Sequence, residues 1–224
     1  MRYGAAEPAQ RTAQTTRAVL FDLDGTLVDT MQVFADVAAG VMARHHGVQA
    51  AIARRRYLQT SGIPFFRQLE EIFPGDPRNA LAASDFEARK VEATVDVVPS
   101  ADTTEALARL STAGLKVAVS SNNFQVQVDR FVSKCPVALD LAMGFGNGLA
   151  KGEPHFIHAC RVFGLTRTDI VFVGDSLADA KLAQVSNVRF VARLGTFSAE
   201  QFRRVVPDVL RVDTLGELVS LLGC

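Results

Sequence analysis

The feature that most constrains this chain is a pair of acidic residues at the end of an apolar run. Residues 18–21 are all apolar, and Asp22-Leu23-Asp24-Gly25-Thr26 follows at once. Side chains two positions apart in a strand point the same way, so Asp22 and Asp24 enter one site at the strand's carboxyl end. Two neighbouring carboxylates require a compensating proton or cation. The pattern therefore predicts an oxygen-ligated metal site with acid–base chemistry, and the alternative is an ordinary turn after a strand.

The rest of the chain alternates short apolar runs with segments of helical spacing, which predicts an α/β fold with a doubly wound parallel sheet. The later runs lack polar alternation, as expected where helices cover both faces of a sheet. The predicted strands are residues 18–21, 116–119, 138–143, 170–173 and 188–191. The predicted helices between them are residues 104–113, 124–133, 155–163 and 176–185.

A block between the first two predicted strands contains only helical patterns. Its predicted helices are residues 33–45, 48–59, 65–73 and 86–96. An ordinary crossover would need a single helix, so this block predicts an inserted all-helical domain. We expect a tail at 1–17, an α/β core at 18–31 and 99–224, and the insertion at 32–98.

Composition narrows the classes of partner and compartment. The 224 residues carry 24 basic and 24 acidic side chains, so nothing predicts a nucleic-acid or membrane partner. No apolar run approaches the roughly 20 residues that span a bilayer, and residues 1–17 lack the core of a secretion signal. Cys135, Cys160 and Cys224 are odd in number and far apart. A cytoplasmic location is therefore expected.

Polar residues follow two later strands and suit a phosphate site. Ser120-Ser121-Asn122-Asn123 offers hydroxyl and backbone N–H groups, although a plain turn is equally compatible. Lys151 precedes a predicted helix and can pair with an anion, although most lysines are solvated surface groups.

A second acidic pair follows the strand at residues 170–173. Asp175 lies at its tip and is a natural metal ligand. Asp179 has two alternative roles: it supports the metal site, or it forms a helix-capping box with Ser176.

These motifs, in this order, resemble the haloacid dehalogenase (HAD) superfamily. They are Asp22-x-Asp24-Gly25-Thr26, Ser121, Lys151 and Gly174-Asp175-Ser176-x-x-Asp179. The helical insertion resembles the cap of phosphoglycolate-phosphatase-like and β-phosphoglucomutase-like members. One departure is Gly152, which stands where many relatives have proline after the lysine. The resemblance implies a Rossmann-like core and a cap that selects the substrate.

The resemblance also implies roles for individual residues. Asp22 is expected to attack phosphorus and form an aspartyl-phosphate, and Asp24 to act as general acid and base. Mg²⁺ is expected on the Asp22 carboxylate, the Asp24 backbone carbonyl and Asp175. The expected substrate-binding residues are Thr26, Ser121, Asn122 and Lys151, with the Thr26 hydroxyl steadying Asp24.

In the cap, the segment 60–65 is expected to reach down over the site, with an ordinary helix–helix turn as the alternative. Arg67 and the arginines at 54–56 are candidates for an anionic group of the substrate, or else form a solvated face. The neighbouring His45 and His46 are expected at a helix end and not as a metal pair.

The expected function is Mg²⁺-dependent hydrolysis of a small phosphorylated metabolite. The alternatives are a phosphomutase acting on a sugar phosphate and a non-catalytic binding protein with the same fold. In the resemblance, dehalogenating members lack an acid at the position of Asp24, which argues against that reaction here. The expected partner is a small phosphate ester, and the oligomeric state is not predicted.

Overall fold

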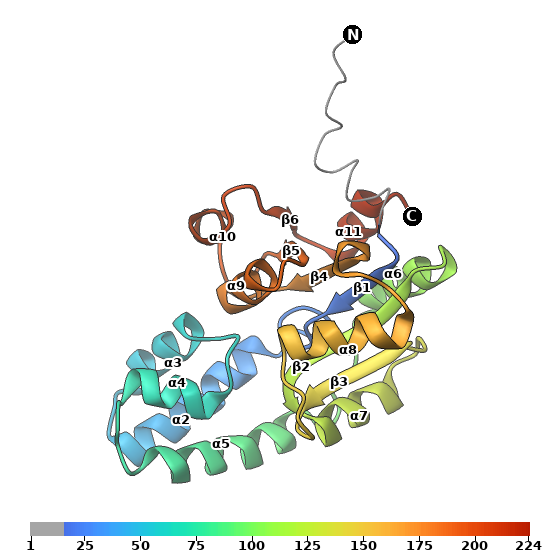
Figure 1. Ribbon diagram of the computed structural model, residues 1–224. Helices are drawn as coiled ribbons and strands as arrows, with labels where there is room; N and C mark the ends of the chain where they lie inside the picture. Colours follow the sequence, from blue (N-terminus) through green and yellow to red (C-terminus); the bar gives the residue numbers. More distant parts are fainter. Residues whose placement is uncertain (1–15) are drawn as a thin grey trace.

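The computed structural model describes residues 16–224 and contains a six-stranded, wholly parallel sheet in the order β3-β2-β1-β4-β5-β6 (Figure 1). The strands are β1 Ala18–Phe21, β2 Lys116–Phe124, β3 Leu141–Phe145, β4 Ile170–Gly174, β5 Arg189–Arg193 and β6 Leu210–Val212. The predicted doubly wound α/β fold is confirmed. β1 lies in the centre between β2 and β4, so its carboxyl end lies at the middle of one edge of the sheet.

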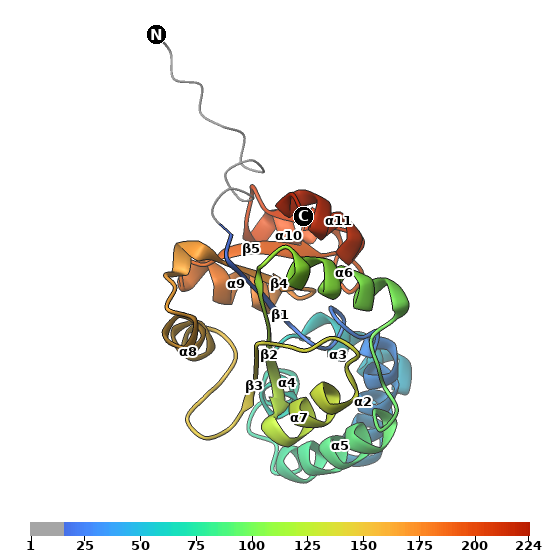
Figure 2. The same cartoon turned by 90° about the vertical axis from the view of Figure 1, so that its right-hand side faces the viewer.

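Helices cover both faces of this sheet (Figure 2). On one face pack α6 Ala101–Thr112, α7 Gln125–Lys134 and α11 Leu215–Leu222. On the other pack α8 Glu153–Phe163, α9 Leu177–Val185 and α10 Ala199–Val205, and a short 3-10 turn, η1 Arg167–Asp169, precedes β4. Alternate residues of β1 face opposite layers, with Val19 in one core and Leu20 in the other. Burial on both faces explains why the central strands β1 and β4 are uniformly apolar.

Several predicted boundaries are wrong for identifiable reasons. The second strand was expected to end at residue 119, but β2 continues to Phe124, with an irregular register against β3 after Ser120. The end of β2 faces the site beyond the sheet, so its residues are polar and have the composition of a turn. β6 was not predicted, because three residues are too short to show a pattern. The tail expected at 1–17 falls mostly outside the described residues, but the backbone of Arg17 already bonds Lys116 at the start of β2 and Asp169 of η1.

Four helices fill the insertion between β1 and α6, here called the cap. They are α2 Met31–His46, α3 Ala50–Gln59, α4 Phe65–Ile72 and α5 Asn79–Ala93. The last was expected to begin at residue 86 but begins at Asn79, whose side-chain amide bonds the Phe73 carbonyl and Glu70. The cap has its own apolar core around Phe34, Tyr57 and Phe86, separate from the apolar clusters that cover the sheet.

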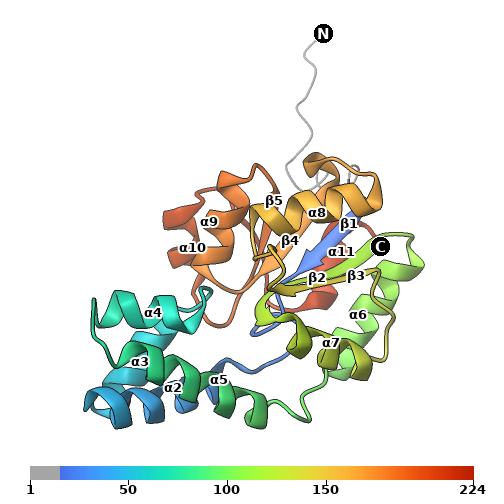
Figure 3. The same cartoon turned by 60° about the horizontal axis from the view of Figure 1, so that its bottom comes forward.

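The cap lies beyond the carboxyl ends of β1 and β2, over the edge where the acidic motif emerges (Figure 3). Among residues 16–224, no helix is long and apolar enough to cross a membrane.

Candidate active site

The first motif leaves β1 in a tight loop that delivers Asp22 to the sheet edge. The Asp22 backbone N–H still bonds the carbonyl of Val173 at 2.8 Å, and the Asp22 carboxylate accepts from the Leu23 N–H at 2.8 Å. Gly25 has φ +80°, and a Cβ there would lie 2.1 Å from Oδ2 of Asp175. The glycine thus allows the loop to approach Asp175 more closely than any side chain would permit.

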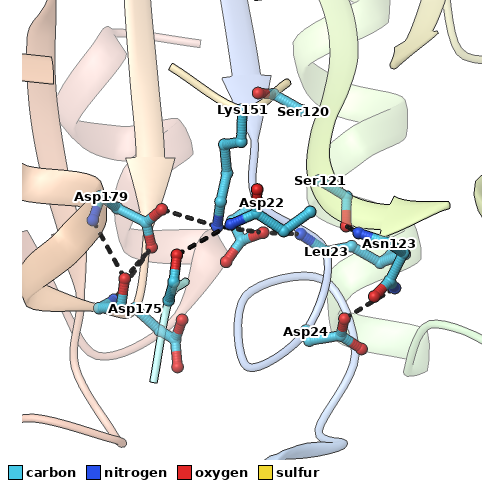
Figure 4. A network of polar contacts seen from close by, with 12 residues as sticks. Asp22, Leu23, Asp24, Ser120, Ser121, Asn123, Lys151, Asp175 and Asp179 are labelled. Atoms are coloured by element: carbon cyan, nitrogen blue, oxygen red, sulfur yellow. Dashed lines mark hydrogen bonds and ion pairs between the residues drawn. The ribbon is translucent and has the colours of Figure 1, made fainter. Parts of the chain in front are cut away.

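A buried lysine joins the first motif to the last (Figure 4). Lys151 Nζ lies 3.0 Å from Oδ1 of Asp22 and 2.8 Å from Oδ1 of Asp179. The other oxygen of Asp179 accepts from the N–H and hydroxyl of Ser176, at 3.1 and 2.6 Å, and caps α9. Asp179 therefore caps a helix with one oxygen and holds the ammonium of Lys151 with the other, so it combines the capping alternative with a contact that neither alternative included.

Asp24 sits apart from that cluster and has its own supports. Oδ1 accepts from the Thr30 hydroxyl at 2.7 Å, and Oδ2 accepts from the Asn123 amide at 2.8 Å. The expectation that the Thr26 hydroxyl holds Asp24 is wrong, because that hydroxyl is buried with no hydrogen-bond partner and does not line the cavity. The loop turns at Gly25, and Thr30, the residue immediately before α2, donates its hydroxyl to Asp24 instead.

The electrostatics of the cluster favour a cation. Burial raises the pKa of Asp22 well above its ordinary range, against the opposing charge of Lys151, and Asp179 and Asp175 raise it further. Burial and then Asp179 raise the pKa of Asp175 to about 7. Burial alone would lower the pKa of Lys151, but Asp179 and Asp22 raise it above its ordinary value. One ammonium thus faces an excess of buried negative charge.

A divalent cation fits this excess. Ligand oxygens of Asp22, Asp175 and Asp179 all lie within 4.8 Å of one another. Hard cations such as Mg²⁺ prefer carboxylate oxygens, and both oxygens of Asp179 already have partners. Asp22 and Asp175 are therefore the side chains best placed to hold the metal. The Thr196 hydroxyl donates to Oδ2 of Asp175 and holds it in place.

The polar end of β2 supplies several parts of the site. Ser121 is buried, and its hydroxyl accepts from the Asn123 N–H at 3.1 Å. The amide of Asn122 donates to the carbonyl of Gly62 in the cap at 2.9 Å. Asn123 bonds Asp24, as described above. Of these consecutive residues, Asn122 thus contacts the cap and Asn123 contacts Asp24, while Ser121 is buried beside them.

One buried histidine was missed by the sequence reasoning. His155 is fully buried at the start of α8, with Nδ1 2.9 Å from the Ser120 hydroxyl and Nε2 3.1 Å from the Gly144 carbonyl. A carbonyl can only accept, so Nε2 carries the proton and Nδ1 accepts from the serine. Burial lowers the pKa of His155 to about 4. This neutral histidine ties β2 and β3 to the loop that carries Lys151.

A cavity lies between core and cap. Core residues on its wall are Asp22, Asp24, Ser121, Asn122, Asn123, Lys151 and Asp175. The cap adds Met31, Phe34, Tyr57, Phe65, Gln68, Phe86, Glu87 and Lys90. The segment expected at 60–65 does reach the site, since Gly62, Ile63 and Pro64 line the cavity.

The cap arginines do not line this cavity. Arg54 pairs with Asp36 at 2.7 Å, and Arg54 and Arg55 border a different, open groove. His45 and His46 end α2 as expected. His45 pairs with Asp85, while His46 approaches Asn79.

Comparison with known proteins agrees with this geometry. Residues 19–193 match the haloacid dehalogenase-like hydrolases. The chain belongs to this family. A phosphoglycolate phosphatase of Nitrosospira multiformis is 30% identical over 185 residues, covering 76% of this chain and 79% of that protein. A phosphoglycolate phosphatase of Xylella fastidiosa is 27% identical over 219 residues, covering 92% of this chain and 91% of that protein. The chain thus falls in the phosphoglycolate-phosphatase-like subgroup that its motifs resemble.

Solved structures share the fold of this HAD-like hydrolase along nearly its whole length. A HAD-like protein of Streptococcus pneumoniae superposes with a TM-score of 0.78 at 17% identity, covering 92% of this chain and 98% of that one. CbbY of Rhodobacter sphaeroides, in complex with phosphate, superposes with a TM-score of 0.73 at 18% identity, covering 93% and 100%. At these identities the likeness concerns the fold alone.

Proposed function

We propose that this HAD-like hydrolase is a Mg²⁺-dependent phosphatase that hydrolyses a small phosphate ester through an aspartyl-phosphate on Asp22. The observation that carries the proposal is the division of labour between two carboxylates on one cavity wall. Asp22 lies in a buried cluster with Lys151 and Asp175, whereas Asp24 is separately held by two neutral donors. A nucleophile and a proton carrier require different environments of this kind.

The first step forms a bond between an Asp22 carboxylate oxygen and phosphorus, while the phosphorus–oxygen bond of the ester breaks. The departing alcohol oxygen takes a proton from Asp24. In the second step Asp24 takes a proton from water, the water oxygen bonds to phosphorus, and the bond to Asp22 breaks to release inorganic phosphate. Lys151 and Ser121 hold the phosphoryl oxygens, since phosphoryl transfer depends mainly on positioning and electrostatics.

Asp22, Asp175 and the backbone carbonyl of Asp24 would hold the metal. When bound, Mg²⁺ supplies positive charge between the carboxylate nucleophile and the phosphate dianion, worth several kcal/mol. Lys151 contributes to the same balance, because its ammonium lies between the carboxylates of Asp22 and Asp179.

Hydrolysis is favoured over mutase chemistry by the charge of the cavity. A sugar bisphosphate intermediate needs cations in the cap for its second phosphate. Among residues 16–224, Lys90 is the one basic residue that the cap contributes to the cavity wall, and its ammonium bonds Asn123. Glu87 adds a negative charge nearby. The curated relatives described above are phosphoglycolate phosphatases, which also favours hydrolysis.

The three cysteines are unpaired, which suits the reducing cytoplasm as the place of this activity.

Hydrolysis of p-nitrophenyl phosphate by the pure protein, with Mg²⁺ and with chelator, tests the proposal. We expect Mg²⁺-dependent turnover that Asp22→Asn lowers by at least about a thousandfold without unfolding the protein. Turnover retained by pure Asp22→Asn would exclude Asp22 as the nucleophile. Isomerisation of a sugar phosphate with little phosphate release would favour the mutase instead.

A further inference from the structure

The side chain of Asn123 lies between a cap lysine and the second aspartate of the core. Its amide nitrogen donates to Oδ2 of Asp24 at 2.8 Å, and its amide oxygen accepts from Nζ of Lys90. Because an amide donates through one end while accepting through the other, a cation on its oxygen strengthens the donation from its nitrogen. Lys90, in α5, therefore acts on Asp24 through Asn123.

The other oxygen of Asp24 is also tied to the cap. It accepts from Thr30, the residue immediately before the first cap helix, α2. Both carboxylate oxygens are thus held by groups in contact with the cap: Thr30 precedes its first helix, and Asn123, at the end of β2, is contacted by Lys90 of its last. The carboxylate of Asp24 therefore has contacts to both the cap and β2, and not to β1 alone.

The cap core fixes the place of the lysine ammonium. Nζ of Lys90 lies 4.8 Å from the ring centroid of Phe34 and 5.9 Å from that of Phe86, on α2 and α5. Such cation–π contacts favour one position for an otherwise flexible side chain. Because both rings belong to the cap, a cap that moves away from the core as a unit carries the ammonium with it and separates it from Asn123.

We propose that Lys90 and Asn123 are positioning residues that orient the carboxyl group of Asp24 for proton transfer only while the cap is closed. Proton delivery to the leaving alcohol is thereby linked to enclosure of the substrate. This inference rests on the proposed phosphatase chemistry, but the contact between Lys90 and Asn123 can be tested without it.

The test compares two phosphate esters in the first turnover, followed by rapid quench. p-Nitrophenolate leaves without a proton, whereas a simple alkoxide needs one. In Lys90→Met we expect the rate of alcohol release from an alkyl phosphate to fall about tenfold or more, and the rate of p-nitrophenol release to change less than about threefold. Lys90→Arg, which keeps a donor cation, should recover most of the alkyl rate. Equal loss for both esters, or no loss for either, would overturn the proposal.

Two controls separate this role from a structural one. Arg89→Met removes a charge from the same helix that pairs with Asp85 at 2.7 Å and does not line the cavity, so it should leave both rates unchanged. Hydrogen–deuterium exchange needs no turnover: Lys90→Met should speed exchange in the cap segment 60–65. Unchanged exchange there would overturn the link to cap closure, even if the wild-type protein hydrolysed neither ester and the proposed function failed.

Discussion

The side-chain amide of Asn122 donates to the backbone carbonyl of Gly62 at 2.9 Å, across 60 residues of sequence. Gly62 has φ +94°, and a Cβ there would lie 2.1 Å from Oγ of Ser176. The cap segment therefore touches the core on two sides, at the end of β2 and at the start of α9. Asn122 was expected to bind substrate; it lines the cavity, and its amide holds the cap over it.

Gly62→Ala should prevent this seating. The added methyl group meets Ser176, so we expect kcat/KM to fall at least about tenfold, the result of a cap that closes imperfectly over the substrate. Gly75→Ala is the matched control, because Gly75 is also in the cap with φ +67° but a Cβ there meets nothing within 4 Å. Both variants bear a similar backbone cost of about 1–2 kcal/mol. Equal kinetics in the two would show that the contact with Ser176 is irrelevant to catalysis.

The sequence was sufficient to predict the fold class and the acidic centre, because both rest on local patterns. Apolar runs without polar alternation indicated a covered parallel sheet, and Asp22, Lys151 and Asp175 each follow or precede a recognisable element. Boundaries failed where tertiary contacts decide them. β2 runs on through polar residues because its end faces a cavity, and β6 is too short to show a period.

The partners of Asp24 could not be predicted, because they depend on how the cap docks. Asn123 lies 99 positions away in sequence, and Lys90 meets it across the interface between cap and core. His155 gave no signal either, since a histidine in a helical pattern is compatible with the surface or the core. Only the approach of β2, β3 and α8 shows that it is enclosed.

Asp24→Asn should slow the release of the alcohol by an amount that depends on the leaving group, and should slow the breakdown of the aspartyl-phosphate for every ester. An amide can accept the bond from Thr30 but cannot deliver a proton as an acid does, so alcohol release from alkyl phosphates should slow about a hundredfold or more. The first-turnover release of p-nitrophenol should change far less. Breakdown of the aspartyl-phosphate should slow for both substrates, because water then lacks its base. Rapid-quench kinetics with the two esters measures each step, and an equal loss of alcohol release for both would argue against the acid role.

Binding of Mg²⁺ should stabilise the protein more at pH 8 than at pH 5.5. The pKa of Asp175 is about 7 in the folded protein against 3.8 ordinarily, so between these values the folded state binds the extra proton. The metal-free protein therefore loses stability as pH rises through this window. Mg²⁺ competes with that proton, so its binding and its increase in Tm should both grow with pH. Thermal unfolding with and without Mg²⁺ measures this.

Asp175→Asn is the control for the metal prediction. It removes a buried carboxylate, so the metal-free variant should lose less stability between pH 5.5 and pH 8 than the wild type. Its Tm should also respond little to Mg²⁺ at either pH. A wild-type increase in Tm that is the same at both pH values, or that survives in Asp175→Asn, would mean that the metal binds elsewhere.

His155 should make the fold sensitive to acid independently of the metal cluster. Its pKa is about 4 in the folded protein and 6.5 ordinarily, so between these values the unfolded chain binds the extra proton. The free energy of unfolding therefore falls as pH decreases from about 7 to about 4, by up to about 3 kcal/mol from this group. His155→Gln keeps a donor for the Gly144 carbonyl but cannot titrate. Urea unfolding across this range should show the wild type losing its advantage over the variant as pH falls; a constant difference would mean that the folded and unfolded chains bind this proton equally, so that folding does not lower the pKa of His155.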